Sequence, residues 1–231
     1  MKYYKKYFFL GPGRNATTTI HKMFLDVGKK SLHNKFWADD ARLHLTCVFD
    51  EYDVFTDCHY RCDFKWLDEK FGDSALFVLN YRNLDEWLVS RWNMVRRIKN
   101  NPNAVRTQRR DPYTGQLVAS KGDLDRQLSN QWLQEYVYFT NLFRKGLIEY
   151  FKNRNNFICL NVSDSVAFSD FANSYIKKGL VVPRENVRSH RVDFFRSPEP
   201  VREALSALKI SPEDYSKVVI DHITKPLKVY F

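Results

Sequence analysis

The N-terminal part of the chain passes directly from an apolar run through a glycine-containing turn into a helical pattern. Residues 7–10 read YFFL, residues 11–19 read GPGRNATTT, and apolar residues then recur at helical spacing up to residue 27. A helix entered in this way leaves its first backbone N–H groups without helical acceptors, at the positive end of the helix dipole. The segment therefore predicts a strand, a turn and a helix whose N-terminus binds a phosphate-like anion.

Short apolar runs alternate with helical patterns along the rest of the chain. The expected strands are residues 6–10, 53–56, 75–79 and 157–162, and the expected helices are residues 17–27, 64–71, 124–153, 165–178 and 200–208, with one more beginning at Asn83. The run ALFVL at 75–79 is apolar throughout, which is typical of a parallel strand buried on both faces. The alternation predicts an α/β fold, a three-layer parallel sheet with helices on both faces.

The length and the polar segments bear on domain organisation. A chain of 231 residues fits a single domain spanning residues 1–231. Residues 99–123 are polar and lack periodicity, so we expect them to form a lid or an acceptor-binding loop. The chain contains no apolar run of about 18 residues, which a membrane-spanning helix needs, and we therefore expect no membrane span.

Charge and cysteine content narrow the possible ligands only slightly. Basic residues exceed acidic ones, 37 against 27, for a formal net charge of +10. This balance favours anionic ligands, among them nucleotides, acidic glycans and nucleic acids. The four cysteines, Cys47, Cys58, Cys62 and Cys159, include only one closely spaced pair, which argues against a zinc cluster. We expect them to be reduced thiols, and we expect no metal site.

The turn does not match the phosphate-binding loop of nucleoside triphosphatases. That loop reads G-x-x-x-x-G-K-[ST], whereas here Ala16 stands in the place of the second glycine and Thr17 in the place of the lysine. The apolar run 75–79 is followed by residues 80–82 (NYR), with no acidic residue to hold magnesium. A nucleotide-dependent, kinase-like P-loop enzyme is therefore disfavoured and is kept as an alternative.

The same segment resembles the loop that binds the 5′-phosphosulfate group in sulfotransferases that use 3′-phosphoadenosine 5′-phosphosulfate (PAPS). Arg14 falls on the basic position of that loop, and Thr17 and Thr18 fall on its paired hydroxyl residues. Ala16 replaces the usual glycine. The resemblance implies that the residues of this loop that bind the donor are Gly13, Arg14, Asn15, Ala16, Thr17, Thr18 and Thr19.

A second match to the same family lies downstream. In the family an arginine just after a central strand and a serine eight positions later hold the 3′-phosphate, and the text ALFVLNYRNLDEWLVSR supplies Arg82 and Ser90 at this spacing. Both residues are expected at the carboxyl edge of the sheet, where folds of this class bind nucleotides. Together the two matches cover about residues 6–25 and 50–95, and they imply a P-loop-like nucleotide-binding topology.

The resemblance implies transfer of a sulfuryl group from PAPS to a hydroxyl or amine of a small-molecule or saccharide acceptor, without a metal. Arg14 is then expected to stabilise the charge that builds on the leaving phosphate. A general base is expected after the second strand, where Asp57 and His59 are two apart and share one face of an extended chain. Both are candidates, with Asp57 preferred, and basic residues within 184–191 are candidates for contacts to the 3′-phosphate.

Smaller features bear on compartment and partners. Asn15 begins an N-x-T sequon inside the predicted anion loop, where a glycan would block the site. This favours the cytoplasm, with a Golgi-lumenal domain trimmed of its anchor as the alternative. His33 is a candidate for lining the acceptor side, with a surface position preferred. A basic nucleic-acid-binding protein is a further alternative, but the basic residues are dispersed and the aromatic residues fall at core periodicity, so we expect no nucleic-acid partner.

Overall fold

The computed structural model describes residues 3–34, 36–58, 62–101, 121–182 and 197–217. The chain forms two compact units: one comprises Met1–Asn83 and Thr140–Ser189, the other Leu84–Phe139 and His190–Phe231. The first unit contains a sheet, and the described part of the second is built from helices.

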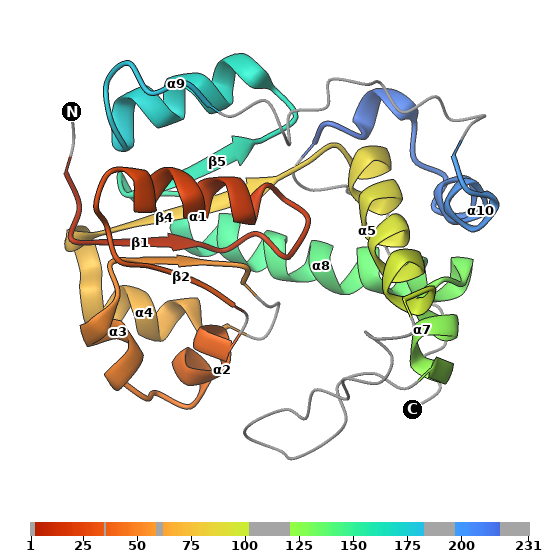
Figure 1. Cartoon of the computed structure of the whole chain (residues 1–231), viewed down its shortest axis with the longest axis horizontal. Helices are drawn as coiled ribbons and strands as arrows, with labels where there is room; N and C mark the ends of the chain where they lie inside the picture. The colour runs from red at the N-terminus through yellow and green to blue at the C-terminus, as the bar shows by residue number, and fades with distance from the viewer. Residues whose placement is uncertain (1–2, 35, 59–61, 102–120, 183–196, 218–231) are drawn as a thin grey trace. The chain divides into compact units, whose positions relative to one another are not determined.

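Within the described residues, the sheet of the first unit has five strands, all parallel, in the order β2-β3-β1-β4-β5. The strands are β1 (Lys6–Phe9), β2 (Ser31–His33), β3 (Val54–Thr56), β4 (Ala75–Tyr81) and β5 (Phe157–Asn161). The helices of this unit are α1 (Thr17–Asp26), α2 (Phe36–Arg42), α3 (Cys47–Glu51), α4 (Phe64–Phe71), α9 (Ser165–Tyr175) and the later part of α8 (Asn130–Phe151) (Figure 1). The predicted α/β fold with a parallel sheet is confirmed.

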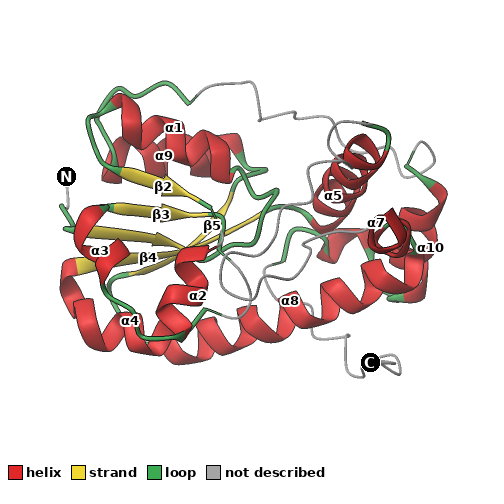
Figure 2. Ribbon diagram, turned by 60° about the horizontal axis from the view of Figure 1, so that its bottom comes forward, coloured by secondary structure: helices red, strands yellow, loops and turns green. Residues whose placement is uncertain are grey.

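Alternate residues of β1 face opposite sides of the sheet and bury both of them. Tyr7 and Phe9 lie against Phe24 of α1, with ring centroids 4.9 and 5.7 Å apart, and Phe9 also meets Phe171 of α9 at 5.9 Å. On the other face, Phe8 contacts an aromatic cluster made of Trp37, Phe49, Phe55, Phe71 and Phe77. Helices therefore cover both faces of the sheet, as Figure 2 shows.

Strands β1, β2 and β3 end at the same level of the sheet and β4 and β5 continue to Tyr81 and Asn161, so the loops that follow the strands meet at one edge. Phe8 of β1 pairs with Phe55 of β3 on one side and with Phe77 of β4 on the other. His33 and Thr56, the last residues of β2 and β3, are also paired. This carboxyl edge is where parallel α/β sheets bind their ligands.

Two parts of the fold differ from the sequence-based expectations. Elements β2, α2 and α3 were not predicted, because they are only three, seven and five residues long and show no clear periodicity. The predicted helix 124–153 is two helices, α7 (Lys121–Gln127) and α8. A new helix begins after Ser129. The Oγ of Ser129 accepts a hydrogen bond from the backbone N–H of Trp132 at 3.2 Å and so caps α8.

The second unit is helical within the described residues. Its elements are α5 (Leu84–Lys99), α7, the first part of α8, α10 (Glu199–Ala207) and a 3-10 turn (Pro212–Asp214). Buried apolar side chains form its core: Leu84, Trp87, Leu88, Leu133, Val137, Val201 and Leu205. The backbone N–H of Leu84 also donates to the carbonyl of Tyr215 at 2.8 Å, which ties the start of α5 to the turn after α10.

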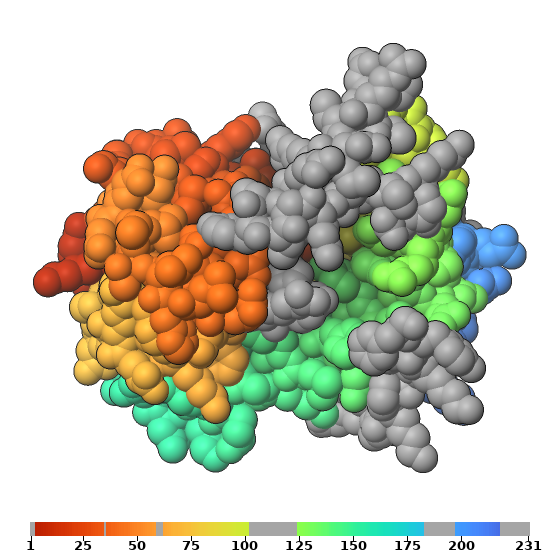
Figure 3. Space-filling model, turned by 90° about the horizontal axis from the view of Figure 1, so that it is seen from below, coloured from red at the N-terminus to blue at the C-terminus, as the bar shows by residue number. Residues whose placement is uncertain are grey.

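The space-filling view shows the side of the first unit that carries α2, α3 and α4, coloured in shades of orange (Figure 3). All four cysteines are free. Among the described helices, none combines the length and the hydropathy that a membrane-spanning segment requires.

Candidate anion-binding site

The loop between β1 and α1 is held against β4 by one amide side chain, that of Asn80. The backbone N–H of Gly11 donates to Asn80 Oδ1 at 2.9 Å, and Asn80 Nδ2 donates to the carbonyl of Asn15 at 2.7 Å. Asn80 is completely buried. One buried side chain therefore fixes both ends of the loop.

Close approach of two backbones explains the first glycine of the loop. A Cβ on Gly11 would lie 1.8 Å from the carbonyl oxygen of Asn80, a distance that no side chain tolerates. The side chain of Asn15, a residue predicted to bind the donor, braces the loop, because its Nδ2 donates to the carbonyl of Pro12 at 2.9 Å and the residue is fully buried. The loop is thus a fixed cradle.

Two residues other than glycine adopt left-handed backbone conformations in this loop. Arg14 has φ of 77° and Ala16 has φ of 57°. Each such residue costs about 1–2 kcal/mol relative to glycine. The φ of Ala16 is one that glycine adopts without strain, which agrees with the glycine that the resemblance places at this position.

Helix α1 begins without a side-chain cap. Its N-cap residue, Ala16, makes no side-chain hydrogen bond, and no acidic residue stands in the first turn. The first hydrogen bond into the helix runs from the N–H of Ile20 to the carbonyl of Ala16 at 3.0 Å. The N–H groups before Ile20 precede the helical ladder, so the positive end of α1 is directed toward the loop.

A small pocket opens where this helix terminus meets the end of β4. Its lining residues are Arg14, Ala16, Thr17, Thr18 and Arg82. The pocket has a volume of about 40 Å³, above the ~10–15 Å³ that a single water molecule needs, so it admits a small group. Two guanidinium groups, two hydroxyl groups and a helix N-terminus surround it, which is the donor set that a tetrahedral oxyanion requires.

The pocket lies where the chain diverges to opposite faces of the sheet. After β1 the chain enters α1, which packs on the face that bears Tyr7 and Phe9. Between β4 and β5 it passes through α8, whose Phe151 lies 4.8 Å from Phe77 on the other face. Such a divergence between neighbouring strands opens a crevice at their carboxyl ends.

Asp57, one of the two candidate bases, lies against the loop. A parallel bridge joins Pro12 to Cys58, and a Cβ on Gly13 would lie 2.9 Å from Asp57 Oδ1. Asp57 has φ of 69° and follows the end of β3, so the alternation of an extended strand does not extend to it. Asp57 is therefore not part of an extended strand, contrary to the expectation, and His59 lies outside the described residues.

The remaining predicted donor-binding residues are placed as follows. Thr19 is buried within α1 and does not line the pocket. Arg82 lines the same pocket as the loop residues. Ser90 is half-buried on α5 and belongs to the second unit. The basic residues within 184–191 and most of the expected lid at 99–123 lie outside the described residues.

A network of hydroxyl and imidazole groups adjoins the pocket, and the sequence pattern did not indicate it. Thr18 Oγ1 lies 3.2 Å from His33 Nε2, and His33 Nδ1 lies 2.9 Å from Thr56 Oγ1. The rings of His33 and His21 stack with centroids 5.3 Å apart, and His21 Nδ1 lies 2.8 Å from Ser31 Oγ. Burial, and then the proximity of His33, lower the pKa of His21. His33, expected at the surface, is half-buried.

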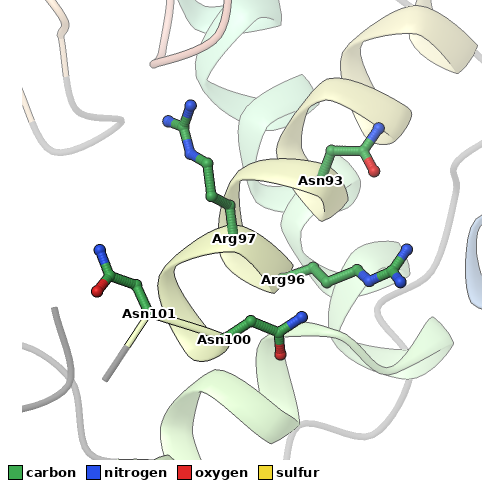
Figure 4. A pocket seen from close by; sticks show the side chains of 5 residues that line it. All are labelled: Asn93, Arg96, Arg97, Asn100 and Asn101. Carbon is green, nitrogen blue, oxygen red and sulfur yellow. The ribbon is translucent and has the colours of Figure 1, made fainter. Parts of the chain in front are cut away.

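A second basic surface lies at the C-terminal end of α5. The residues that line this shallow hollow are Asn93, Arg96, Arg97, Asn100 and Asn101. All five are exposed, and Figure 4 shows the side chains of Arg96 and Arg97 pointing in different directions. Arginines are common at helix C-termini because they complement the helix dipole. The hollow therefore lacks the convergence of donors that distinguishes the pocket at α1.

Among the described residues, no cluster of three or more histidine, cysteine, aspartate or glutamate side chains could hold a metal ion. Comparison of the chain with protein-family models, with curated proteins and with solved structures found no match. The fold and the pocket define a parallel α/β protein with a candidate oxyanion site at the carboxyl edge of its sheet.

Proposed function

We propose that the chain is a sulfotransferase that moves a sulfuryl group from PAPS to a hydroxyl or amine of a small-molecule or saccharide acceptor. The observation that supports this most is that Arg14, Thr17 and Thr18 share one pocket with Arg82. The first three residues match one motif of the family, and Arg82 matches the other. Residues of two short motifs, each of which alone is weak evidence for the family, thus line a single pocket.

The donor set of the pocket suits the chemistry of sulfuryl transfer. In such an in-line displacement, negative charge spreads over peripheral oxygens and builds on the leaving phosphate. Arg14 supplies a permanent positive charge, and Thr17 and Thr18 supply hydroxyl donors beside the N-terminus of α1. Asp57 is the proposed general base, because its carboxylate lies beside Gly13 of the same loop.

The binding of nucleotide is tested by thermal shift with three ligands. Adenosine 3′,5′-bisphosphate without metal is expected to raise the melting temperature strongly, whereas ATP with magnesium and a short oligonucleotide are expected to raise it little. A ligand that binds only the folded state stabilises that state, so the ranking of the shifts reports the ranking of affinities. A larger shift with ATP and magnesium contradicts the proposal and favours the kinase-like alternative.

The roles of the two arginines are separated by comparing two nucleotides. Ser90→Ala should weaken adenosine 3′,5′-bisphosphate by about tenfold to a hundredfold and leave adenosine 5′-phosphate nearly unchanged, because only the bisphosphate carries the 3′-phosphate. Arg82→Ala should weaken both nucleotides, and the bisphosphate more, because Arg82 also lines the pocket that contains Arg14. Arg14→Ala should lower turnover more than product binding. Arg97→Ala removes the same charge from an exposed position outside the pocket and serves as the control. Equal losses for both nucleotides in Arg82→Ala would assign Arg82 to the 5′ end instead.

A further inference from the structure

We infer that Asn80 is a positioning residue for anion binding: its buried amide holds the loop between β1 and α1 in the strained conformation that places the donors of the loop beside Arg82. Asn80 is fully buried and is not among the residues that line the pocket, so it acts through the loop. The inference deepens the proposed function and concerns the same pocket. It rests on that function only in requiring that the pocket binds an oxyanion.

The backbone ladder between β1 and β4 stops where the loop begins. The N–H of Leu10 still donates to the carbonyl of Val78, at 2.8 Å. Donors to one neighbour alternate along a strand, so the next donor toward β4 would be that of residue 12, and Pro12 has no N–H. Instead, the side chain of Asn80 accepts from the N–H of Gly11, at 2.9 Å. A side chain therefore attaches the loop to β4 where the backbone ladder cannot.

The partners of two amide side chains determine which way each amide faces. A backbone N–H can only donate and a carbonyl can only accept, so Asn80 Oδ1 faces Gly11, and Asn80 Nδ2 faces the carbonyl of Asn15, 2.7 Å away. By the same rule, Asn15 Nδ2 faces the carbonyl of Pro12, at 2.9 Å. Both side chains are completely buried, so loss of either leaves buried backbone groups without partners. These hydrogen bonds hold residues 11–15 together and against β4.

The same hydrogen bonds hold two strained residues. Arg14 and Ala16 have positive φ, 77° and 57°. Such conformations persist only where the surrounding contacts over-determine them. Arg14 lies between Pro12 and Asn15, which are joined by one of the hydrogen bonds, and Ala16 follows Asn15 directly. Without Asn80 we expect the loop to relax toward negative φ, which turns the Arg14 side chain and the first N–H groups of α1 away from the pocket.

Strand β4 also carries the other arginine of the pocket. Arg82 directly follows the last residue of β4 and lines the pocket together with Arg14. Strand β4 pairs with β1 on one side and β5 on the other, so it is a fixed support. Asn80 lies two residues before Arg82, and a loop that moves away from Asn80 therefore also moves away from Arg82. The amide of Asn80 thus sets the spacing of two guanidinium groups that a single oxyanion must contact together.

Asn80→Leu tests the inference, because it keeps the approximate shape of the side chain, removes both of its hydrogen bonds and adds no charge near the anion. Asn156→Leu is the matched control. Asn156 is also a buried amide, and its Nδ2 donates to two backbone carbonyls at 3.0 Å, one of them that of Ala75 at the opposite end of β4. Where a leucine variant does not fold, Asn80→Ala and Asn156→Ala provide the same comparison.

The two measurements are the affinity for inorganic sulfate, by calorimetry at one pH, and the free energy of unfolding, by urea. Both leucine variants should lose stability, because each leaves buried backbone groups without partners. Only Asn80→Leu should also lower the affinity for sulfate, by about tenfold or more. A residue with a purely structural role would change the free energy of unfolding and leave the sulfate affinity of the folded chain unchanged.

Ala16→Gly tests whether Asn80 acts through the strained loop. Glycine adopts a positive φ without strain, so a loop with glycine at this position depends less on the hydrogen bonds from Asn80. The ratio of sulfate affinities with and without Ala16→Gly should therefore be about threefold larger in the Asn80→Leu background than in the unmodified chain. This double-mutant cycle cancels any direct effect of the missing methyl group on the pocket.

Each outcome bears on a different claim. Equal sulfate affinities in Asn80→Leu and Asn156→Leu overturn the inference and leave Asn80 a purely structural residue. An effect of Ala16→Gly that is the same in both backgrounds shows that Asn80 does not act through the strained loop, and it overturns the inference as well. Sulfate binding that depends on Asn80, without preferential stabilisation by adenosine 3′,5′-bisphosphate, contradicts the proposed function alone. Absence of sulfate binding in the unmodified chain overturns both.

Discussion

At the residue scale, the loop between β1 and α1 depends on contacts between backbone and side chain that span long stretches of sequence. Asn80 uses both its amide oxygen and its amide nitrogen to hold the loop, and its partner Gly11 is 69 residues away. Asn80 follows an apolar run and reads in the sequence only as a polar strand end. Gly11 reads as a turn glycine, and only the structure shows that it is required by contact with another backbone.

Gly11→Ala should therefore be strongly destabilising. The added Cβ would meet the carbonyl oxygen of Asn80, which belongs to a central strand and cannot rotate away, so we expect a loss of about 3 kcal/mol or more in the free energy of unfolding. Gly146→Ala is the matched control. It lies within α8, where the nearest atom to the added Cβ is Phe64 Cζ at 3.9 Å, and it should gain up to about 1 kcal/mol. Urea unfolding of both variants measures the difference, and a similar change in the two contradicts the steric argument.

At the scale of the element, the helices of the first unit differ in whether a side chain caps their N-terminus. Asp63 caps α4 by accepting from the N–H of Trp66, and Asp164 caps α9 by accepting from two N–H groups. Helix α1 begins at Ala16 without a side-chain cap. An acidic cap at α1 would occupy the donors and repel an anion. Helix α3 also lacks a side-chain cap, at Thr46, but it is the N-terminus of α1 that borders the pocket, which agrees with a binding role.

Asp164→Ala should destabilise the fold by about 1 kcal/mol, because it removes the acceptor of the hydrogen bonds from Val166 and Ala167, each 3.0 Å long. Asp170→Ala on the same helix removes an exposed carboxylate that caps nothing and should change stability by less than about 0.5 kcal/mol. The free energies of unfolding of the two variants provide the comparison. Equal losses would show that the cap does not stabilise α9.

At the scale of the whole molecule, the stacked histidines make stability depend on pH. The pKa of His21 lies below its ordinary value of 6.5, because the ring is buried and faces His33. The unfolded chain therefore binds more protons than the folded chain between these two pKa values. Stability from this residue is fully present above about pH 6.5 and is lost as the pH falls through the lowered pKa.

His21→Gln should remove this part of the pH dependence. The melting temperature of the unmodified chain is expected to fall more steeply than that of the variant as the pH is lowered below about 6.5. Above about pH 7.5 the difference between the two should be constant, because the ring is neutral in both folded and unfolded states. Melting curves across this range test the prediction, which parallel curves at all pH values would contradict.

Local patterns in the sequence were enough to predict much of the fold. The apolar runs of β1, β4 and β5 are long enough to indicate buried parallel strands, and Gly72 ends α4 at Phe71 as the pattern predicts. These features depend on neighbours within a few residues, which a sequence displays directly. The same holds for the loop motif, since Arg14, Thr17 and Thr18 are adjacent in the chain and all line the pocket.

Only the tertiary structure determines where the short elements form and which side chains contact the residues of the pocket. Strand β2 has three residues, Ser31–His33, and becomes a strand because it pairs with β3, not because of its own composition. His33 meets Thr18 through that pairing and through the packing of α1. Contacts of this kind form between residues distant in sequence, so local propensity and periodicity do not contain them.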